Sequence, residues 1–260
     1  LLSIIIPTLN EGHALPACLG SIGAQTFKDH ETIVIDSGSS DGTREAALGA
    51  GAKMLDYPGR PLGARHQGLL ASQGALILLL DADQVLYPDS LERAVAAMEG
   101  ADMLVLEESS YQPQGFLQRS ISRQKAALQC RKEGIPPHCY PRLYRRHVLE
   151  SAFAKLPLET LGEVFAYDDR ILYAKASEVS AKVSFLPKGV MHIEERSWRS
   201  MMRHAYRQGR SSSSVASLGL GEEAIAPESS FALLRRAAAN GYLTYSVLKE
   251  VSFRLGRRLG

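Results

Sequence analysis

The first hundred residues alternate between short apolar runs and segments whose apolar residues recur at helical spacing. The apolar runs are 2–7, the start of 31–43, 53–55, 75–80 and 103–107, and the helical segments are 14–25, 43–51, 62–72 and 88–98. A strand-length run without polar alternation is typical of a strand buried on both faces. Strands of this kind separated by helices form βαβ units. The chain therefore predicts an α/β fold with a mostly parallel sheet flanked by helices.

Composition narrows the classes of protein that fit this pattern. The chain has 260 residues, 45% hydrophobic and 22% charged, which suits one large globular domain or one domain with an appendage. A formal net charge of +2 gives no basis for binding nucleic acid. The cysteines Cys18, Cys130 and Cys139 lack metal-type spacing and predict free thiols in a reducing cytosol. No apolar run approaches the ~20 residues that cross a bilayer, and the start lacks signal-peptide features. We expect a cytoplasmic protein.

Polar clusters follow three of the predicted strands directly. They are 8–11, 36–41 and 81–84. Any one of them could be an ordinary turn, because Asn, Asp, Gly and Ser are common turn residues. The carboxyl ends of parallel strands meet at one edge of a sheet, however, and ligands bind there. The three clusters together predict a binding site at that edge.

The segment "LILLLDADQ" (76–84) ends a buried strand with Asp81 and Asp83, one residue apart. Two carboxylates this close repel each other unless a positive group lies between them. Oxygen ligands suit a hard cation such as Mg²⁺ or Mn²⁺, which shares its coordination between carboxylates and phosphate oxygens. The segment predicts a metal–diphosphate site, although a capped turn is the alternative for this short motif alone.

Four segments carry a resemblance to a known family. They are "SIIIPTLNEG", "QTFKDHETIVIDSGSSDGT", "PLGARHQGLLASQGALILLLDADQ" and "FAYDDRILYAKA", in order over residues 2–198. Together they resemble the family 2 glycosyltransferases of the Rossmann-like GT-A fold. The resemblance implies a nucleotide-sugar donor, a Mg²⁺ or Mn²⁺ ion, and inverting displacement by a hydroxyl acceptor. The Q-x-x-R-W signature and membrane helices of the processive synthases are missing, so we expect a single addition per acceptor.

The resemblance also assigns roles to individual residues. Those matched to donor binding are Pro7, Thr8, Leu9, Glu11, Asp36, Ser37, Arg65, Asp81 and Ala82, and those matched to the metal are Asp83, Asp81 and His192. Asp83 is the expected direct ligand, and Arg65 is expected to offset diphosphate charge. Ser37 stands where many members have a second aspartate that bonds the base. The donor is therefore left open among UDP-, GDP- and dTDP-linked sugars.

The segment "YDDR" (167–170) matches the family's acidic pair on the acceptor side. An alcohol becomes a good nucleophile when a base removes its proton during attack. The match assigns that base to Asp169, with Asp168 as its neighbour and an acceptor contact. Mutual repulsion of the two carboxylates would raise the pKa of the base. The alternative, that both cap the following helix, is compatible with this role.

Beyond residue 107 the pattern is looser. We expect a helix over 114–132, a loop over 134–146 that enters a strand, a helix within 164–176, a strand pair within 182–195 joined by 187–189, a helix over 198–210, a linker at 217–228 and a helical tail over 231–259. The domain prediction is a catalytic domain, 1–198, and a basic helical extension, 199–260. Within the catalytic domain, residues to about 107 serve the nucleotide sugar and 108–198 the acceptor. Arg142 or Arg145 is expected to meet an anionic or polar group.

The tail mixes basic with apolar residues, as a cationic amphipathic helix does. Such a helix can lie on an anionic membrane. Contact through 229–260 would place the protein on the cytoplasmic face of the membrane and favour a lipid-linked acceptor over a free glycan. Packing on the catalytic domain and a dimer contact are the alternatives.

Two other functions share parts of this pattern. A nucleotidyltransferase has a similar sheet and acidic metal ligands, but it needs a Gly-rich basic signature after the first strand, where this chain has "PTLNEG". A non-catalytic nucleotide-sugar-binding protein would not require Asp81, Asp83 and Asp169 together. Both are less consistent with the sequence than a transferase.

Overall fold

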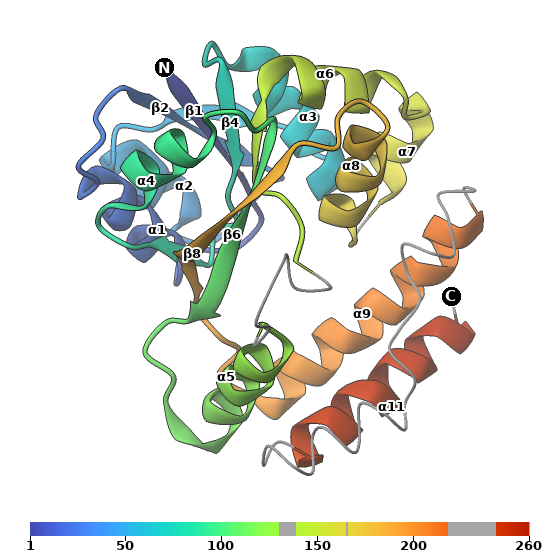
Figure 1. The fold of residues 1–260 in the computed structure, drawn as a ribbon. Helices are drawn as coiled ribbons and strands as arrows, with labels where there is room; N and C mark the ends of the chain where they lie inside the picture. The colour runs from blue at the N-terminus through green and yellow to red at the C-terminus, as the bar shows by residue number, and fades with distance from the viewer. Residues whose placement is uncertain (130–138, 165, 218–242, 260) are drawn as a thin grey trace.

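The computed structural model describes residues 1–129, 139–164, 166–217 and 243–259. In these parts of the chain, one eight-stranded sheet has the strand order β3-β2-β1-β4-β7-β6-β8-β5 (Figure 1). The strands are β1 (Leu2–Thr8), β2 (His30–Asp36), β3 (Lys53–Asp56), β4 (Leu76–Leu79), β5 (Gln84–Leu86), β6 (Met103–Ser110), β7 (Leu143–Arg145) and β8 (Val183–His192). The helices are α1 (Leu15–Gly23), α2 (Thr43–Gly49), α3 (Pro61–Ala71), α4 (Ser90–Ala97), α5 (Gly115–Gln129), α6 (Arg146–Ala154), α7 (Leu158–Glu163), α8 (Asp168–Ser177), α9 (Trp198–Ser217) and α11 (Leu243–Leu259).

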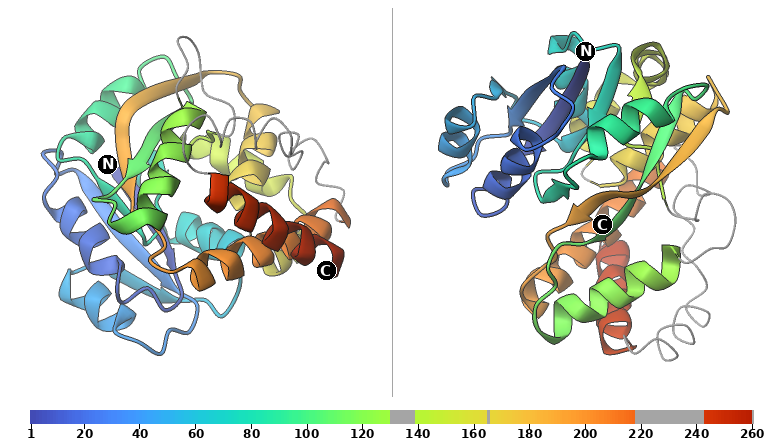
Figure 2. Two further views of the ribbon diagram at one scale, coloured as in Figure 1. Left: turned by 90° about the horizontal axis from the view of Figure 1, so that it is seen from below. Right: turned by 60° about the vertical axis from the view of Figure 1, so that its left-hand side comes forward.

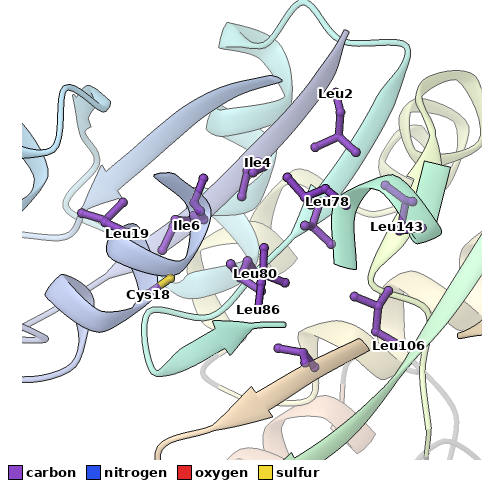
Figure 3. Packing of buried hydrophobic residues seen from close by; sticks show 14 of the residues in the cluster. Leu2, Ile4, Ile6, Cys18, Leu19, Leu78, Leu80, Leu86, Leu106 and Leu143 are labelled. Carbon is purple, nitrogen blue, oxygen red and sulfur yellow. The ribbon is translucent and has the colours of Figure 1, made fainter. Parts of the chain in front are cut away.

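Strands β3, β2, β1 and β4 are parallel, as the alternating pattern predicts. Successive residues of β1 point to opposite faces: Ile4 and Ile6 belong to one core cluster and Ile5 to the other. Helices α1 and α4 cover the first cluster, and α3, α6 and α8 cover the second. Figure 3 shows the first cluster, in which Cys18 packs among leucines and isoleucines. Burial on both faces explains the long apolar runs of β1, β4 and the second half of β2, whereas the edge strand β3 has exposed ends at Lys53 and Asp56.

The second half of the sheet is mixed. Strand β7 is antiparallel to β4 and β6, and β5 is antiparallel to β8, whereas β6 and β8 are parallel. The predicted strand pair within 182–195 is wrong, because β8 is one continuous strand. Its pairing shifts register between Leu106 and Glu108, opposite Lys188, which has a positive φ of 50°. The residues read as a turn therefore make a bulge.

Helices α5, α9 and α11 lie together beyond the end of the sheet (Figure 2). Their contact is a small cluster that includes Leu117, Ile121, Met201 and Tyr245, with Trp198 packed against it. Helix α9 continues past its predicted end to Ser217. The rest of the predicted linker, the segment 231–242 of the tail, and Cys130 fall outside the described residues. In the described parts, no helix is both long and apolar enough to span a membrane.

Candidate donor and metal site

The predicted polar edge is present where β1, β2 and β4 end. Thr8, the last residue of β1, donates weak hydrogen bonds to the carbonyl of Ile35 (3.3 Å) and to Asp36 (3.4 Å) at the end of β2. Asp36 is buried and accepts hydrogen bonds from Ser39 and Arg44. Burial raises the pKa of Asp36, but these bonds outweigh it and lower the pKa. The first two loops are therefore fixed against each other.

One cavity of about 550 Å³ lies at this edge. Every predicted site residue except Asp36 lines it: Pro7, Thr8, Leu9, Glu11, Ser37, Arg65, Asp81, Ala82, Asp83, Asp168, Asp169 and His192. Asp36 does not line the cavity but accepts a hydrogen bond from Thr8, which does. Residues separated by up to 185 positions in the sequence thus share one space.

The positive groups beside Asp81 are two arginines. Arg142 Nη1 lies 2.6 Å from one carboxylate oxygen, and Arg65 Nη2 lies 2.5 Å from the other. Burial raises the pKa of Asp81, but the charges of Arg142 and Arg65 lower it far more. Both oxygens are thus engaged by guanidinium groups, which leaves Asp81 a poorer metal ligand than Asp83. Arg142 lines the cavity, whereas Arg145 pairs with Asp102 away from it; a contact of either arginine with the acceptor stays a prediction.

Arg65 itself is almost fully buried. Its Nε is paired with Asp168, so that Arg65 joins the end of β4 to the start of α8. Its remaining nitrogen, Nη1, is buried and has no hydrogen-bond partner among the residues that the structure describes. A buried guanidinium donor without a partner is costly. Nη1 is therefore a donor available to a ligand in the cavity.

Asp83 and His192 form the second charged pair. Oδ2 of Asp83 lies 3.2 Å from Nε2 of His192, and the backbone N–H of Ile193 donates to the carbonyl of Asp83 (2.7 Å). Burial lowers the pKa of His192, but the adjacent Asp83 carboxylate raises it well above the usual value. The imidazole of His192 thus lies directly beside the Asp83 carboxylate.

This pair fits a divalent cation with an open coordination shell. No group of three or more His, Cys, Asp or Glu side chains within the described ranges is arranged to hold a metal. The chain instead offers one carboxylate oxygen and one imidazole nitrogen at a spacing suited to neighbouring ligand positions. Behind them, Glu194 Oε2 lies 3.3 Å from Nδ1 of His192. Metal-ligating histidines usually contact a carboxylate through their other nitrogen.

Glu11 adds a further acid to this corner. Burial and then the charge of Asp83 raise the pKa of Glu11 to about 7. The turn before it is fixed by Asn10, at φ 57°, whose side-chain oxygen accepts from the backbone of Ser40 (2.9 Å). A crowded group of carboxylates stores repulsion that a bound cation would relieve.

Asp168 and Asp169 open helix α8. Tyr167, immediately before them, is left-handed at φ 71°, a conformation that is uncommon outside glycine and asparagine. Burial, followed by the charge of Asp168, raises the pKa of Asp169. Asp169 also accepts a hydrogen bond from the backbone N–H of Arg170 (2.8 Å). Asp169 thus has both a first-turn position and the environment of a stronger base.

Sequence reasoning missed Glu108, Lys125 and Glu194. Lys125 Nζ contacts Glu108 (2.6 Å) and Glu194 (2.8 Å) directly behind His192. The signals were faint: an acidic residue near the end of an apolar strand, a glutamate two residues after His192, and a lysine on a polar helix. Only the folded chain brings them together.

The sheet and its acidic edge define an α/β fold of the GT-A type. A family model described as glycosyl transferase family 2 matches residues 3–153. The chain belongs to this family.

Relatives and solved structures agree with that assignment. The chain is 31% identical over 166 residues to the undecaprenyl-phosphate 4-deoxy-4-formamido-L-arabinose transferase of Aeromonas hydrophila, covering 58% of this chain and 51% of that protein. It is 34% identical over 103 residues to an Escherichia coli glucosyltransferase, WfgD, named for UDP-Glc and a GlcNAc-diphosphoundecaprenol, covering 38% of this chain and 41% of that protein. The matches thus span about half or less of these relatives.

Two solved structures share the fold. Staphylococcus aureus TarS 1–349 with UDP-GlcNAc has a TM-score of 0.60 at 18% identity, covering 98% of this chain and 92% of that one. Mycobacterium tuberculosis glucosyl-3-phosphoglycerate synthase, in complex with Mn²⁺, UDP-glucose and phosphoglyceric acid, has a TM-score of 0.57 at 21% identity, covering 88% and 81%.

Proposed function

We propose that this protein transfers a sugar from a nucleoside-diphosphate donor to a hydroxyl acceptor, with inversion at the anomeric carbon. The observation that carries the proposal is the single cavity that holds the strand-end polar residues, the Asp83–His192 pair and Asp169. UDP is the nucleotide to test first, because both solved neighbours are complexes with UDP-sugars.

Asp83 and His192 would hold Mg²⁺ or Mn²⁺ together with the diphosphate. The bound ion would stabilise the negative charge that develops on the leaving nucleoside diphosphate. Asp81 contributes through its two arginines, which keep positive charge at the same edge. The free Nη1 of Arg65 supplies a further hydrogen-bond donor for the donor substrate.

Asp169 is the proposed general base. Inverting displacement needs a base on the acceptor side of the sugar, opposite the diphosphate. Asp169 lines the same cavity as the proposed metal pair but belongs to a different element, α8. Its raised pKa makes it a better proton acceptor than an ordinary aspartate. Asp168, held by Arg65, keeps the first turn of α8 in place.

A lipid-linked acceptor is the acceptor class we propose. The two relatives above are named for undecaprenyl-linked substrates. Helix α11 presents exposed apolar residues, Val247, Val251 and Leu255, in a basic segment. The corresponding division of the chain is a catalytic domain, 1–198, and an extension, 199–260, that meets the membrane surface.

Thermal unfolding with nucleotides tests the donor site. UDP, GDP and dTDP are added separately, each with and without Mn²⁺. If one nucleotide stabilises the protein only in the presence of Mn²⁺, the result would support the proposal and identify the nucleotide base of the donor. Absence of any metal-dependent stabilisation would contradict it. Nucleotide binding without sugar transfer to any lipid-linked or glycan acceptor would instead favour a non-catalytic binding protein.

A further inference from the structure

The Asp83–His192 pair is supported from behind by a lysine of α5, a helix outside the central sheet. Lys125 Nζ lies 2.8 Å from Oε1 of Glu194 and 2.6 Å from Oε1 of Glu108. Its side chain is 20% exposed and that of Glu194 only 4%. One ammonium group therefore joins two glutamates from different strand ends.

Each glutamate uses its other oxygen toward the proposed metal site. Oε2 of Glu194 lies 3.3 Å from Nδ1 of His192. Oε2 of Glu108 accepts a hydrogen bond from Gln84 Nε2 (2.8 Å), and Gln84 Oε1 accepts from the backbone N–H of Asp81 (3.0 Å). Lys125 is thus connected to the site in two ways. Through Glu194 it reaches the imidazole of His192, and through Glu108 and Gln84 it reaches the backbone of Asp81.

The charges explain why a cation is needed at this point. Burial alone would raise the pKa of Glu108, but Lys125, His192 and Arg142 lower it to about 2. Glu194, whose side chain is only 4% exposed, contacts Lys125 through one oxygen and His192 through the other. Without Lys125, two ionised groups with little access to water would face each other.

The imidazole depends on Glu194 for its orientation. Nδ1 of His192 is buried and makes no hydrogen bond of good geometry in the structure, so the approach of Glu194 Oε2 is its available carboxylate contact. When a cation is bound beside Asp83, an N–H at Nδ1 directed at Glu194 would leave Nε2 as the nitrogen that can hold it. A proton on Nε2 instead would close that position to a metal.

We propose that Lys125 and Glu194 are positioning residues, which hold His192 with Nδ1 toward Glu194 and Nε2 toward the cation beside Asp83. The proposal rests on the metal-dependent transfer proposed above. Neither residue is assigned contact with the substrate. Through Lys125, the metal site depends on the docking of α5, an element distant from the donor loops in sequence.

Mn²⁺ affinity of the full chain tests this inference. Binding is measured by titration calorimetry in the presence of the nucleoside diphosphate that stabilises the protein. We expect Lys125→Met to weaken Mn²⁺ binding by about 10- to 100-fold, the usual effect of losing an outer-shell partner. Lys125→Arg keeps the charge and should restore most of the affinity. Lys175→Met, which removes a lysine paired with Glu178 on α8, is the matched control and should leave affinity unchanged.

Turnover provides a second readout. Lys125 is not placed against the substrate, so saturating Mn²⁺ should restore most of the kcat of Lys125→Met, while the apparent KM for Mn²⁺ stays raised. If Lys125→Met does not fold, Glu194→Gln decides the question. Wild-type Mn²⁺ affinity in a folded Lys125→Met or Glu194→Gln protein would overturn the inference.

The two proposals fail in different ways. If the wild-type protein binds no Mn²⁺ with any of the three nucleotides, the metal-dependent function itself is wrong. If the wild type binds Mn²⁺ and Asp83→Ala abolishes binding, while Lys125→Met does not weaken it, only the positioning role is wrong.

Discussion

Two aspartates of the cavity have separable roles at the scale of single residues. Asp83→Ala removes an oxygen from the proposed metal site and should abolish both transfer and metal-dependent nucleotide affinity. Asp169→Asn should abolish transfer but retain that affinity, because an amide cannot take the acceptor proton. Transfer assays and Mn²⁺-dependent nucleotide titration measure the two effects. Equal loss of nucleotide affinity in both variants would contradict this division.

The environment of Asp169 predicts the pH dependence of the reaction. The base acts in its ionised form, so kcat/KM should fall as pH drops through its pKa. Burial and Asp168 raise that pKa, so this fall should begin above the range of an ordinary aspartate, about 4. Asp168→Asn removes a negative neighbour and should move the acid limb to lower pH. An unmoved limb, or a shift to higher pH, would count against Asp169 as the base.

The strand-end residues could be identified because they follow runs whose burial is visible in the sequence, whereas Arg65, Asp168 and Asp169 were identified through the family resemblance. Asp81 and Asp83 directly follow an apolar run, and this alone places them at the sheet edge. The partners of Asp81 could not be identified in the same way. Arg142 precedes a three-residue strand after an irregular segment, and its pairing with Asp81 depends on the antiparallel insertion of β7 beside β4. The positive groups beside Asp81 could therefore be identified only from the folded structure.

At the scale of elements, helices α9 and α11 pack with their backbones in contact. A Cβ placed on Gly209 would lie 2.0 Å from the carbonyl oxygen of Phe253, and one on Gly256 would lie 2.0 Å from that of Tyr206. Backbone atoms cannot move aside as a flexible side chain does. We expect Gly209→Ala to separate the helices and destabilise the protein by about 1–3 kcal/mol, the usual cost of overpacking.

Thermal and urea unfolding measure this effect, and α1 supplies a control. Gly20 has open space around its Cβ position, so Gly20→Ala should be neutral or stabilising by up to about 1 kcal/mol. Helix α9 also carries Arg207 and Gln208 on the cavity wall, so Gly209→Ala should weaken nucleotide binding as well. Equal stability of the Gly209→Ala and wild-type proteins would show that the two helices do not need this close approach.

The order of strands and helices along the chain was predictable where a single hydrophobic periodicity dominated the sequence. Strands β1, β2 and β4 carry buried apolar runs and alternate with helices, so the succession of strands and helices along the chain follows from hydrophobicity. Helix α6 was not predicted, because it begins at Arg146 directly after β7, with no loop residues between them. The bulge in β8 was read as a turn, since Pro187 and Gly189 are common in turns; Gly189 instead lies against Leu106 of β6, where a Cβ would clash.

At the scale of the whole molecule, a helical group is joined to the acidic sheet edge. Helix α9 contributes Arg207 and Gln208 to the wall of the cavity, and α5 is linked to the site through Lys125, which pairs with Glu194 and Glu108. Substitutions at the metal pair and in this helical group should therefore affect each other. The predicted boundary at residue 198 stays a prediction; α9 begins there, and Met201 of α9 packs with Leu117 and Ile121 of α5 across it.

The outer surface of α11 predicts how the whole molecule meets its acceptor. Val247, Val251 and Leu255 are 40%, 51% and 50% exposed, and they recur every four residues on one side of the helix. Arg254 and Arg258 fall on the same side by helical spacing. Apolar side chains flanked by arginines suit an anionic bilayer, where each basic residue near the surface contributes about 1 kcal/mol.

Vesicle flotation at low salt tests this surface. Wild-type protein should float with vesicles containing anionic lipid and should be released by 0.5 M salt, about where the Debye length falls below 5 Å. The pair Val251→Ser and Leu255→Ser, and separately Arg254→Gln with Arg258→Gln, should each reduce flotation and transfer to a lipid-linked acceptor, but not metal-dependent nucleotide binding. Leu48→Ser, which changes an exposed leucine of α2, is the matched control. Undiminished flotation of both α11 variants would leave this helix without a role at the membrane, and the acceptor would then have to reach the cavity from solution.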